Sequence, residues 1–454
     1  TIGSATTTTL RVGTVVETDL AGISSTTSLA SDDMAFVSAS EFPTLNARAT
    51  DSISVLAPIT TTVGTLLLQG DSDSSGAGSN DITIAGGIAL YSVGDLHVLA
   101  SGGISLPGGV GTTNTFTGGA ITLADIASAA ADVRIQSGGN ISAAEVSIGI
   151  GDLLVELDTG NLGVFQADFD AIDANLVNVF AGVNDTLRLN GAVTTAAAAG
   201  VDIDAGGVEF NAPVTANGSG IVRVTNSGSL SIAEGADVFA GGGFTQDGAG
   251  AILLGADIST PGTPVVLGRP VTLLNTVGDL VTIDTTIGAP AGANITFSFS
   301  TNGSVAGGQS LTLNAGTGGD IRFNTGVGAI ARLNAVRILN ARDVTAAAGL
   351  QAVSLTQVAG QRLTTFLGPV IAFGGGIDLN GNEFVFANNI NSASGGLIQI
   401  TNSGPLTFGA AFTVIATGGL LQDGAGPVAL GLNVNTSGDP VTITGPVTLR
   451  DTAA

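Results

Sequence analysis

The sequence contains no cysteine, no tryptophan and no lysine, and all 12 of its basic residues are arginine. Without cysteine, disulfide bonds and thiolate metal centres are excluded. Without lysine, Schiff-base chemistry and phosphate binding by a P-loop are excluded as well. Because the isoelectric point is about 4.1 and no basic cluster exists, we expect no nucleic-acid partner.

Aromatic residues and charges are also scarce, at 4% and 11% of the chain, although the formal net charge is −24. No run of 18 apolar residues occurs, so we expect no membrane span. Glycine is abundant, with 69 residues in 454, but it lacks the three-residue period of collagen. Hydrophobic residues make up 44% of the sequence, which predicts a folded chain rather than a disordered one.

Short segments that alternate apolar and small polar residues recur along the chain, separated by Gly, Asn, Asp and Ser. This period of two is typical of β-strands, and the separating residues are typical of turns. Two alanine-rich stretches, 127–131 and 196–199, are interpreted as small inward-facing residues rather than helices. Clear examples of the strand pattern are Asp81–Ile84, Leu96–Leu99, Leu187–Leu189, Ile295–Phe299 and Val441–Ile443.

The second half of the sequence repeats itself at an offset of 176 residues. Residues 201–278 align with 377–454 without a gap, and 28 of the 78 aligned pairs are identical. The strongest blocks are TNSG at 225–228 and 401–404, and QDGAG at 246–250 and 422–426. Such a match indicates a repeat architecture, and its turn-forming residues preserve a backbone path rather than a chemical site.

These features predict an all-β protein, a parallel β-solenoid (β-helix) with turns of roughly 20–25 residues. The alternative is an array of antiparallel β-sandwich units. The expected organisation is a strand-like segment and possible donor strand at 1–30, a cap or loop region at 31–80, solenoid at 81–200, repeat unit 1 at 201–376 and a truncated repeat unit 2 at 377–454.

The stretches 307–323 (GGQSLTLNAGTGGDIRF), 244–255 (FTQDGAGAILLG) and 401–408 (TNSGPLTF) resemble the repeats of exported bacterial β-strand-repeat proteins. Those proteins are similar to filamentous-haemagglutinin-type adhesins and surface fibres. The resemblance is clearest over 201–454 and implies a right-handed parallel β-helix, secretion, and a structural or adhesive role. The Asn-Pro motifs of that family's secretion domain are missing, which leaves the export route open.

One loop, 71–81 (DSDSSGAGSND), suggests a metal site. Alternating oxygen ligands followed by glycine are typical of the start of a Ca²⁺ loop. The glutamate expected at the twelfth position is replaced by Ile82, so an acidic surface loop is the alternative. Ca²⁺ is the only cofactor that we consider. Its candidate ligands are Asp71, Asp73, Ser75 and Asp81.

Catalytic and cofactor-binding residues are not assigned. The single histidine, His97, lies in a strand-like run and is interpreted as a half-exposed strand residue. Asp168 and Asp170 would share one strand face, and paired carboxylates are what a glycosidase or polysaccharide lyase needs. We expect a solvated face there instead, and therefore a protein that is not an enzyme.

The two ends of the chain suggest how copies assemble. A solenoid that stops at 454 leaves unpaired backbone groups, and such an edge invites another strand. When one end of a copy binds the opposite end of the next copy and the series does not close into a ring, the product is a filament. A fragment of a longer repeat chain is the alternative. The candidate interface residues are Leu10, Val12 and Val16 at one end, and Val441, Ile443, Val447 and Leu449 at the other.

The sequence therefore predicts a secreted, extracellular structural subunit of a filament or matrix, which partners with itself head to tail. The chain starts at Thr1 and its single methionine is Met34, which favours removal of an export signal. A monomeric or surface-tethered β-helical adhesin, binding cell-surface or matrix glycans, is the alternative function, and a β-helix lyase or glycosidase is a second one.

Overall fold

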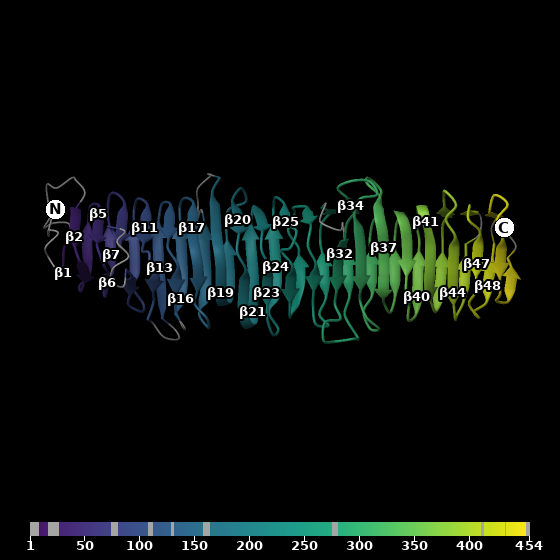
Figure 1. Ribbon diagram of the computed structural model, residues 1–454, viewed down its shortest axis with the longest axis horizontal. Coiled ribbons are helices and arrows are strands. Elements are labelled where there is room, and N and C mark those ends of the chain that lie inside the picture. The colour runs from purple at the N-terminus through teal and green to yellow at the C-terminus, as the bar shows by residue number, and fades with distance from the viewer. Residues whose placement is uncertain are drawn as a thin grey trace. The chain divides into compact units, whose positions relative to one another are not determined.

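The computed structural model describes residues 9–16, 27–73, 80–107, 112–128, 131–157, 164–274, 280–409, 413–431 and 433–450. These residues form a parallel β-solenoid of about 19 turns, without a helix in the ranges given. Each strand pairs in parallel with the equivalent strand of the neighbouring turn (Figure 1). The predicted fold class is confirmed, since the sandwich alternative required antiparallel pairs.

The chain divides into two compact units. Unit 1 comprises residues 1–220 and 225–228, and unit 2 comprises 221–224 and 229–454. Within each unit a turn contributes three strands, so the strands form three columns. The described part of the chain has no helix long and apolar enough to cross a membrane.

The three columns of unit 1 share some long strands that bend from one column into the next. The first column holds β1 Thr9–Val12, β3 Asp33–Phe36, β6 Ile53–Val55, β9 Ile82–Ile84, β12 Ile104–Ser105, β15 Ile126–Ala127, parts of β17 Ile141–Ser147, β19 Gln166–Phe180 and β21 Val193–Ala205, and β23 Val214–Ala216. The second holds β4 Ser40–Phe42, β7 Ile59–Thr61, β10 Ala89–Ser92, β13 Thr113–Gly118, β16 Asp132–Ser137, β18 Asp152–Leu157 and parts of β19 and β21. The third holds β2 Thr27–Ser31, β5 Leu45–Ala49, β8 Leu66–Gln69, β11 Leu96–Leu99, β14 Ile121–Leu123, parts of β17 and β19, β20 Thr186–Leu189 and β22 Gly207–Phe210.

The columns of unit 2 are named A, B and C, in the order in which the chain visits them. Column A holds β24 Ile221–Asn226 (its residues 221–224), β27 Gly243–Gln246, β30 Val265–Leu267, β33 Ile295–Phe297, β36 Ile321–Phe323, β38 Val344–Ala346, β40 Leu363–Phe366, β42 Glu383–Phe386, β45 Leu406–Phe408, β48 Val428–Leu430 and β51 Val447–Leu449. Column B holds β25 Leu230–Ile232, β28 Ile252–Leu254, β31 Val271–Leu273, β34 Thr301–Gly303, the first parts of β39 Leu350–Gln357 and β41 Val370–Gly381, β43 Ile390–Ser392, β46 Thr413–Ala416 and β49 Asn433–Asn435. Column C holds β26 Val238–Ala240, β29 Ile258–Ser259, β32 Leu280–Asp284, β35 Ser310–Asn314, β37 Leu333–Asn340, the second parts of β39 and β41, β44 Ile398–Asn402, β47 Leu420–Gln422 and β50 Val441–Ile443.

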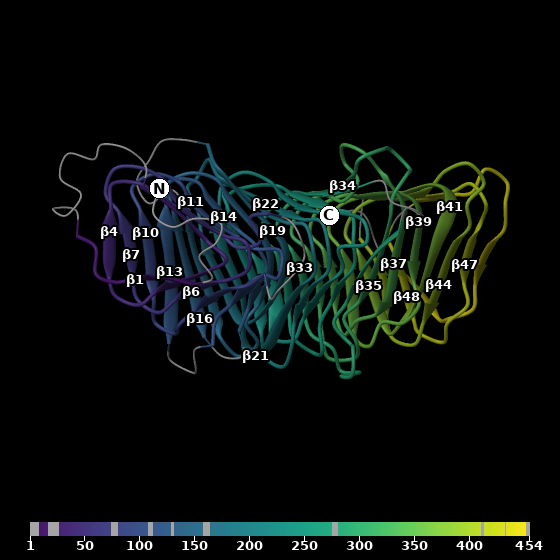
Figure 2. The same ribbon diagram turned by 60° about the vertical axis from the view of Figure 1, so that its left-hand side comes forward.

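The core lies inside the turns, because alternate residues of each strand point inward. In column A the inward positions stack equivalent aromatic rings on one another. Phe366, Phe386 and Phe408 form a stack with ring centroids 5.2 and 5.3 Å apart, and Phe297 stacks on Phe323 at 4.9 Å. All five rings are buried. The in-register parallel ladder thus aligns like residues. Figure 2 shows the stacked strands of unit 2 that carry them.

The structure differs from the prediction in the N-terminal part of unit 1. Residues 31–80 were expected to form a cap or loop region, but the strands β3 to β8 lie there and join the parallel ladder. Their inward positions hold apolar side chains of mixed size, from Ala47 and Val55 to Phe36 and Phe42, all of which are buried. The strand pattern was therefore present but weak, because the outward positions are mixed polar and apolar.

The alanine-rich stretch 196–199 belongs to strand β21 and is not helical. Its expected inward orientation is wrong for Ala196 and Ala199, which are exposed. This stretch lies at the bend where β21 passes from one column to another. Small residues suit a bend because they let the backbone turn without a side-chain clash. Ala129 and Ala130 of the other stretch lie outside the described residues.

The 176-residue repeat does not equal a whole number of turns. Gln246 lies in column A, in register with Leu267 and, further along the same column, with Phe408. Its repeat mate Gln422 lies in column C, in register with Ile400. Equivalent QDGAG segments therefore occupy two different corners of unit 2, which shows that these two corners accept the same local sequence.

Candidate functional site

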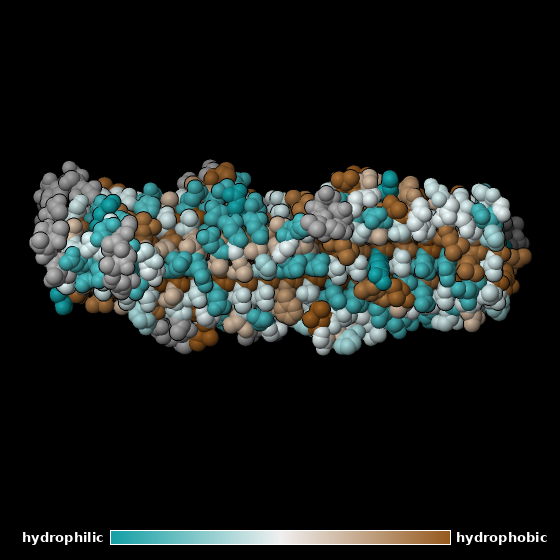
Figure 3. Space-filling model, in the orientation of Figure 1, coloured by the Kyte–Doolittle hydropathy of each residue, from teal (hydrophilic) through white to brown (hydrophobic). Residues whose placement is uncertain are grey.

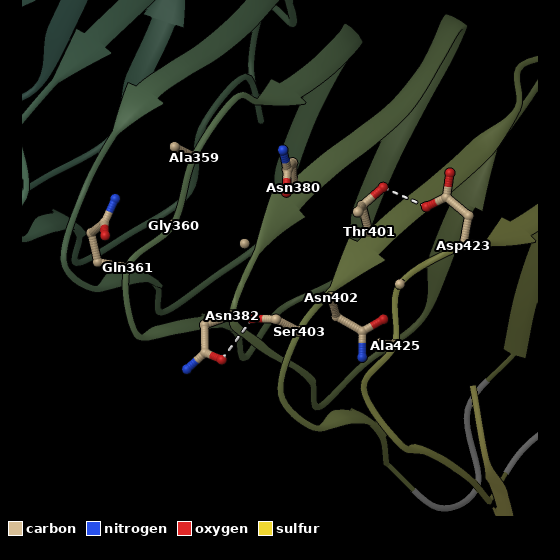
Figure 4. A pocket seen from close by; sticks show the side chains of 12 residues that line it. Ala359, Gly360, Gln361, Asn380, Asn382, Thr401, Asn402, Ser403, Asp423 and Ala425 are labelled. Atoms are coloured by element: carbon tan, nitrogen blue, oxygen red, sulfur yellow. Dashed lines mark hydrogen bonds between the residues drawn. The ribbon is translucent and has the colours of Figure 1, made fainter. Parts of the chain in front are cut away.

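An open groove of about 740 Å³ crosses four consecutive turns of unit 2 (Figure 4). It lies at the corner between columns C and A, where each turn leaves a column C strand and enters the next column A strand. Each turn contributes three residues, and the four triplets are 359–361, 380–382, 401–403 and 423–425. We call this feature the corner groove.

The walls of the corner groove carry hydroxyl, amide and carboxylate groups. Thr401 Oγ1 donates a hydrogen bond to Asp423 Oδ1 at 2.5 Å, and Gln399 Nε2 donates to Asp423 Oδ2 at 3.1 Å. Ser403 Oγ donates to Asn382 Oδ1 at 3.0 Å. Figure 4 shows the Thr401–Asp423 and Ser403–Asn382 pairs, each joining residues of successive turns. The polar side chains of the groove are thus held in place by hydrogen bonds to one another and to Gln399.

A second set of polar side chains fixes the backbone beneath the groove. Gln422 and Asn402 are buried, with exposures of 1% and 0%. Gln422 Nε2 donates to Asn402 Oδ1 and to the Gly424 carbonyl, each at 2.7 Å. Asn402 Nδ2 donates to the Gly404 carbonyl at 2.6 Å. Gln422 Oε1 accepts from the backbone nitrogen of Thr444 at 3.1 Å. Because a buried amide is costly to leave unpaired, these bonds fix the shape of the corner.

Glycine forms part of the groove floor because successive corners approach closely there. A Cβ on Gly424 would lie 2.1 Å from the carbonyl oxygen of Asn402, which is backbone and cannot move aside. Any side chain at this position would therefore push the turns apart, and its absence leaves the groove open.

The charge of the groove comes from a single side chain. Among the twelve described lining residues Asp423 alone is ionisable, and the apolar side chains are limited to alanine. The remaining groups are amides and hydroxyls, which both donate and accept hydrogen bonds. This arrangement suits an uncharged ligand rich in hydroxyl groups and offers no positive charge for a phosphate, sulfate or carboxylate.

The first copy of the repeat carries arginine where the second has neutral or small residues. Arg223, the repeat mate of Gln399, places Nε and Nη2 at 3.2 and 2.9 Å from Asp247 Oδ2. Arg269 Nε donates to the Gly248 carbonyl at 2.6 Å. The aspartate of the first QDGAG segment is thus neutralised by an ion pair. Its mate Asp423 accepts hydrogen bonds from the neutral groups of Gln399 and Thr401.

Other exposed surface on unit 2 is partly apolar. Figure 3 shows hydrophobic patches among hydrophilic surface along the part that carries β34 to β48. Ile330 and Val305 are 87% and 55% exposed. Phe373 is also exposed, and the guanidinium carbon of Arg332 lies 5.0 Å from its ring centroid. None of these residues lines the corner groove.

Unit 1 has a smaller hollow of about 360 Å³ over its second column. Its polar groups bond to one another: the backbone nitrogen of Asp152 donates to Asp132 Oδ1 at 3.0 Å, and Arg134 pairs with Glu156 at 2.7 Å. This internal pairing leaves fewer groups for a ligand than the corner groove offers.

The predicted Ca²⁺ loop is only partly described. Ser75 lies outside the described residues, together with the rest of 74–79. Asp71 has a positive φ of 52°, and its Oδ2 accepts a hydrogen bond from Ser101 Oγ at 2.6 Å. Asp73 and Asp81 lie at the two edges of the gap. Over the described ranges no group of three or more acidic or histidine residues is placed to hold a metal, and Ca²⁺ binding stays a prediction.

The predicted interface residues lie at the first and last described turns. Leu10 and Val12 lie in β1, which pairs with β3 of its own chain, and Val12 is 8% exposed. Val16 is 40% exposed. At the other end Ile443 is half-buried, and exposure reaches 48% for Val441, 46% for Val447 and 78% for Leu449.

The residues considered for catalysis are surface strand residues. His97 is half-buried in β11, between Leu67 and Thr122 of the adjacent turns. Asp168 and Asp170 both lie on the outer side of β19, and Asp168 Oδ1 is 3.9 Å from Arg188 Nη1. The interpretation of His97 as a half-exposed strand residue is confirmed.

Sequence reasoning did not predict the corner groove. The TNSG and QDGAG segments predict repeated turns, and nothing in either segment alone indicates a groove. The available signal was the recurrence of Asn, Ser or Asp directly after strands in successive turns, at Asn382, Ser403 and Asp423. That signal becomes meaningful only when the turn length and the strand register are known.

No protein-family model matches the sequence, and neither a curated protein nor a solved structure shows significant similarity.

Proposed function

We propose that this protein is a structural subunit of an extracellular filament or matrix, and that its copies assemble head to tail by continuing the β-ladder from one molecule into the next. The protein would act mechanically rather than catalytically. The alternative, a monomeric adhesin, uses the same solenoid as a carrier for a binding surface.

One observation carries this proposal: inward positions that are buried in one turn are exposed in the next. Leu420 and Val428 are 2% and 1% exposed, while their in-register partners Val441 and Val447 are 48% and 46% exposed. The three strands β49, β50 and β51 pair with the preceding turn, and the described residues supply no strand for their other edge. Another rung placed on this turn would bury these side chains.

Stacking of one copy on the next would contribute a large free energy of association for a small contact area. Each large aliphatic side chain that becomes fully buried contributes about 1.5–3 kcal/mol. The strand edge also offers backbone donors and acceptors, which pair readily with another strand. The complementary surface on the next copy is the outer edge of the first turn, whose strand β1 pairs with β3 on one side. Because Val12 is already buried there, we infer edge-on stacking rather than insertion of a detached strand.

Head-to-tail assembly can be tested by placing a charge on the last described turn, which consists of β49, β50 and β51. Leu449→Asp puts a carboxylate on the surface that stacking would bury, and we expect it to raise the concentration needed for polymer formation about tenfold or more. Thr448→Asp adds the same charge to the same strand but on its outward side, and should leave assembly nearly unchanged. Sedimentation velocity across a concentration series measures both.

Two outcomes would contradict the proposal. One is a wild-type chain that sediments as a monomer at every concentration. The other is equal loss of assembly in both aspartate variants, which would indicate general charge repulsion rather than a stacked rung.

A further inference from the structure

We propose that the corner groove of unit 2 binds an uncharged oligosaccharide, lying across the turns and recognised through its hydroxyl groups. This inference is independent of assembly, because every group involved belongs to the lateral corner 359–425 of one unit.

The dimensions fit a chain-like ligand. Four turns contribute to the groove, and adjacent rungs of a sheet lie about 4.8 Å apart. The lining therefore extends over roughly 14 Å, which is long enough for a short oligosaccharide. Its volume of about 740 Å³ also lies within the range of small-molecule sites.

The chemistry favours hydroxyl groups. A carboxylate accepts up to about four hydrogen bonds, and Asp423 accepts two from the side chains of Thr401 and Gln399. Asn382 accepts from Ser403 through Oδ1, so its two amide hydrogens remain to donate. Asn380 is exposed beside Thr401, in register with it. The groove therefore offers both acceptors, on Asp423, and donors, on Asn382, to the hydroxyl groups of a sugar chain.

Other ligand classes fit less well. The described lining residues include no arginine and one carboxylate, so an anionic ligand would be repelled and a divalent cation would lack ligands. Their apolar side chains are no larger than alanine, which disfavours a hydrophobic ligand. No strand edge is open at this corner, because the ladder pairs run through columns A and C on both sides, so an added peptide strand is disfavoured too.

The first repeat copy supplies a natural blocked version. There Arg223 pairs with Asp247, whereas Asp423 accepts its hydrogen bonds from the neutral side chains of Gln399 and Thr401. Gln399→Arg reproduces in the second copy an arrangement that the protein already folds with. We expect the new arginine to form an ion pair with Asp423, and therefore to lower the affinity for the sugar about tenfold or more.

Isothermal titration against short oligosaccharides of glucose, mannose, galactose or N-acetylglucosamine tests the proposal. The wild-type chain should bind at least one of them, and Asp423→Asn should weaken that binding severalfold. Gln351→Arg makes the same substitution as Gln399→Arg in column B, away from the groove, and should bind like the wild type. A thermal unfolding scan establishes that each variant folds.

Three results would overturn the proposal: no binding to any uncharged oligosaccharide of the panel, equal binding by wild type and Gln399→Arg, or binding restricted to acidic oligosaccharides. Each is distinct from failure of head-to-tail assembly, because titration at concentrations below any polymer threshold reports on a single copy.

Discussion

Buried amide side chains organise the corners of this solenoid. Gln422 and Asn402 bond to each other and to backbone carbonyls of the turn, and Gln246 donates to the carbonyl of Gly250 at 3.2 Å in the first repeat copy. Another buried amide, Gln357, accepts from Thr364 Oγ1 at 3.0 Å. An inward glutamine at the end of a strand thus satisfies backbone groups that a tight turn leaves without strand partners.

Removing one of these amides should destabilise the fold. Gln422→Leu keeps the volume but leaves Asn402 Oδ1 without its donor and the backbone nitrogen of Gly445 without its acceptor. We expect a loss of about 2–3 kcal/mol in the free energy of unfolding of this region. Chemical denaturation measures it, with the exposed Gln361→Leu as the matched control. A loss of the same size in both variants would contradict the assigned role.

Asp343 should make unit 2 sensitive to acid. The hydrogen bond from Arg362, whose Nε lies 2.9 Å from Asp343 Oδ1, lowers the pKa of this carboxyl below its ordinary value of 3.8. A lowered pKa gives stability that is present above pH 3.8 and is lost as the pH falls through the folded-state pKa. Asp343→Asn should therefore lower the thermal midpoint at pH 6 and have little effect at the acid end of a pH series. A constant difference across the series would contradict this.

Asp257 should show the opposite sign. Burial, followed by the nearby carboxylate of Asp237, raises its pKa above 3.8, although the backbone nitrogen of Thr282 donates to it at 2.7 Å. A raised carboxyl pKa costs stability as the pH rises through the window above 3.8. Asp257→Asn removes this cost. The thermal unfolding midpoint of the variant, relative to that of the wild type, should therefore increase as the pH rises from 3 to 6. A midpoint that falls relative to the wild type as the pH rises would show that ionised Asp257 stabilises the fold.

At the scale of the strand, the in-register parallel ladder stacks buried aromatic rings on one another. Phe386 lies between Phe366 and Phe408 in column A, and all three rings are buried. Phe386→Ala should cost about 3–5 kcal/mol, because it removes a fully buried ring and leaves a cavity between two others. Val385→Ala, on the outward side of the same strand β42, should cost much less. Comparable unfolding midpoints for the two variants would argue against the stack.

The sequence predicts these strands well where apolar and polar residues alternate cleanly. The predicted Leu96–Leu99 coincides with β11, and Val441–Ile443 coincides with β50. The pattern fails where a strand bends through a corner, as in β21, and where the outward positions mix polar and apolar residues, as in 31–80. Ala196 and Ala199 face outward in β21, and Leu67 is an outward apolar residue in 31–80, so hydrophobicity alone does not mark the buried face.

The turn-forming segments also build the corner groove, which the sequence alone does not reveal. The TNSG and QDGAG segments fix corners, and the same residues form the walls and floor of the corner groove. How the aspartate of such a corner is paired depends on one side chain of the preceding turn: Arg223 forms an ion pair with Asp247 in the first copy, and Gln399 donates a hydrogen bond to Asp423 in the second. That dependence becomes apparent only when the register between turns is known, which explains why the groove was not predicted.

For the whole molecule, the repeat and the turn have different periods. Because Gln246 and Gln422 lie in different columns, duplication of 176 residues has extended the ladder without preserving which column each segment occupies. A parallel ladder tolerates this, since the pairing depends on backbone groups and on alternation of inward and outward positions. The same tolerance is what would allow a rung from another molecule to continue the ladder.

Electron cryomicroscopy of the assembled protein tests the head-to-tail account most directly. We predict filaments in which the rung spacing of about 4.8 Å continues without interruption across each junction, with Val441, Val447 and Leu449 buried against the first turn of the next copy. Dispersed single copies at high concentration, or copies joined through their lateral faces with this last rung still exposed to solvent, would contradict it.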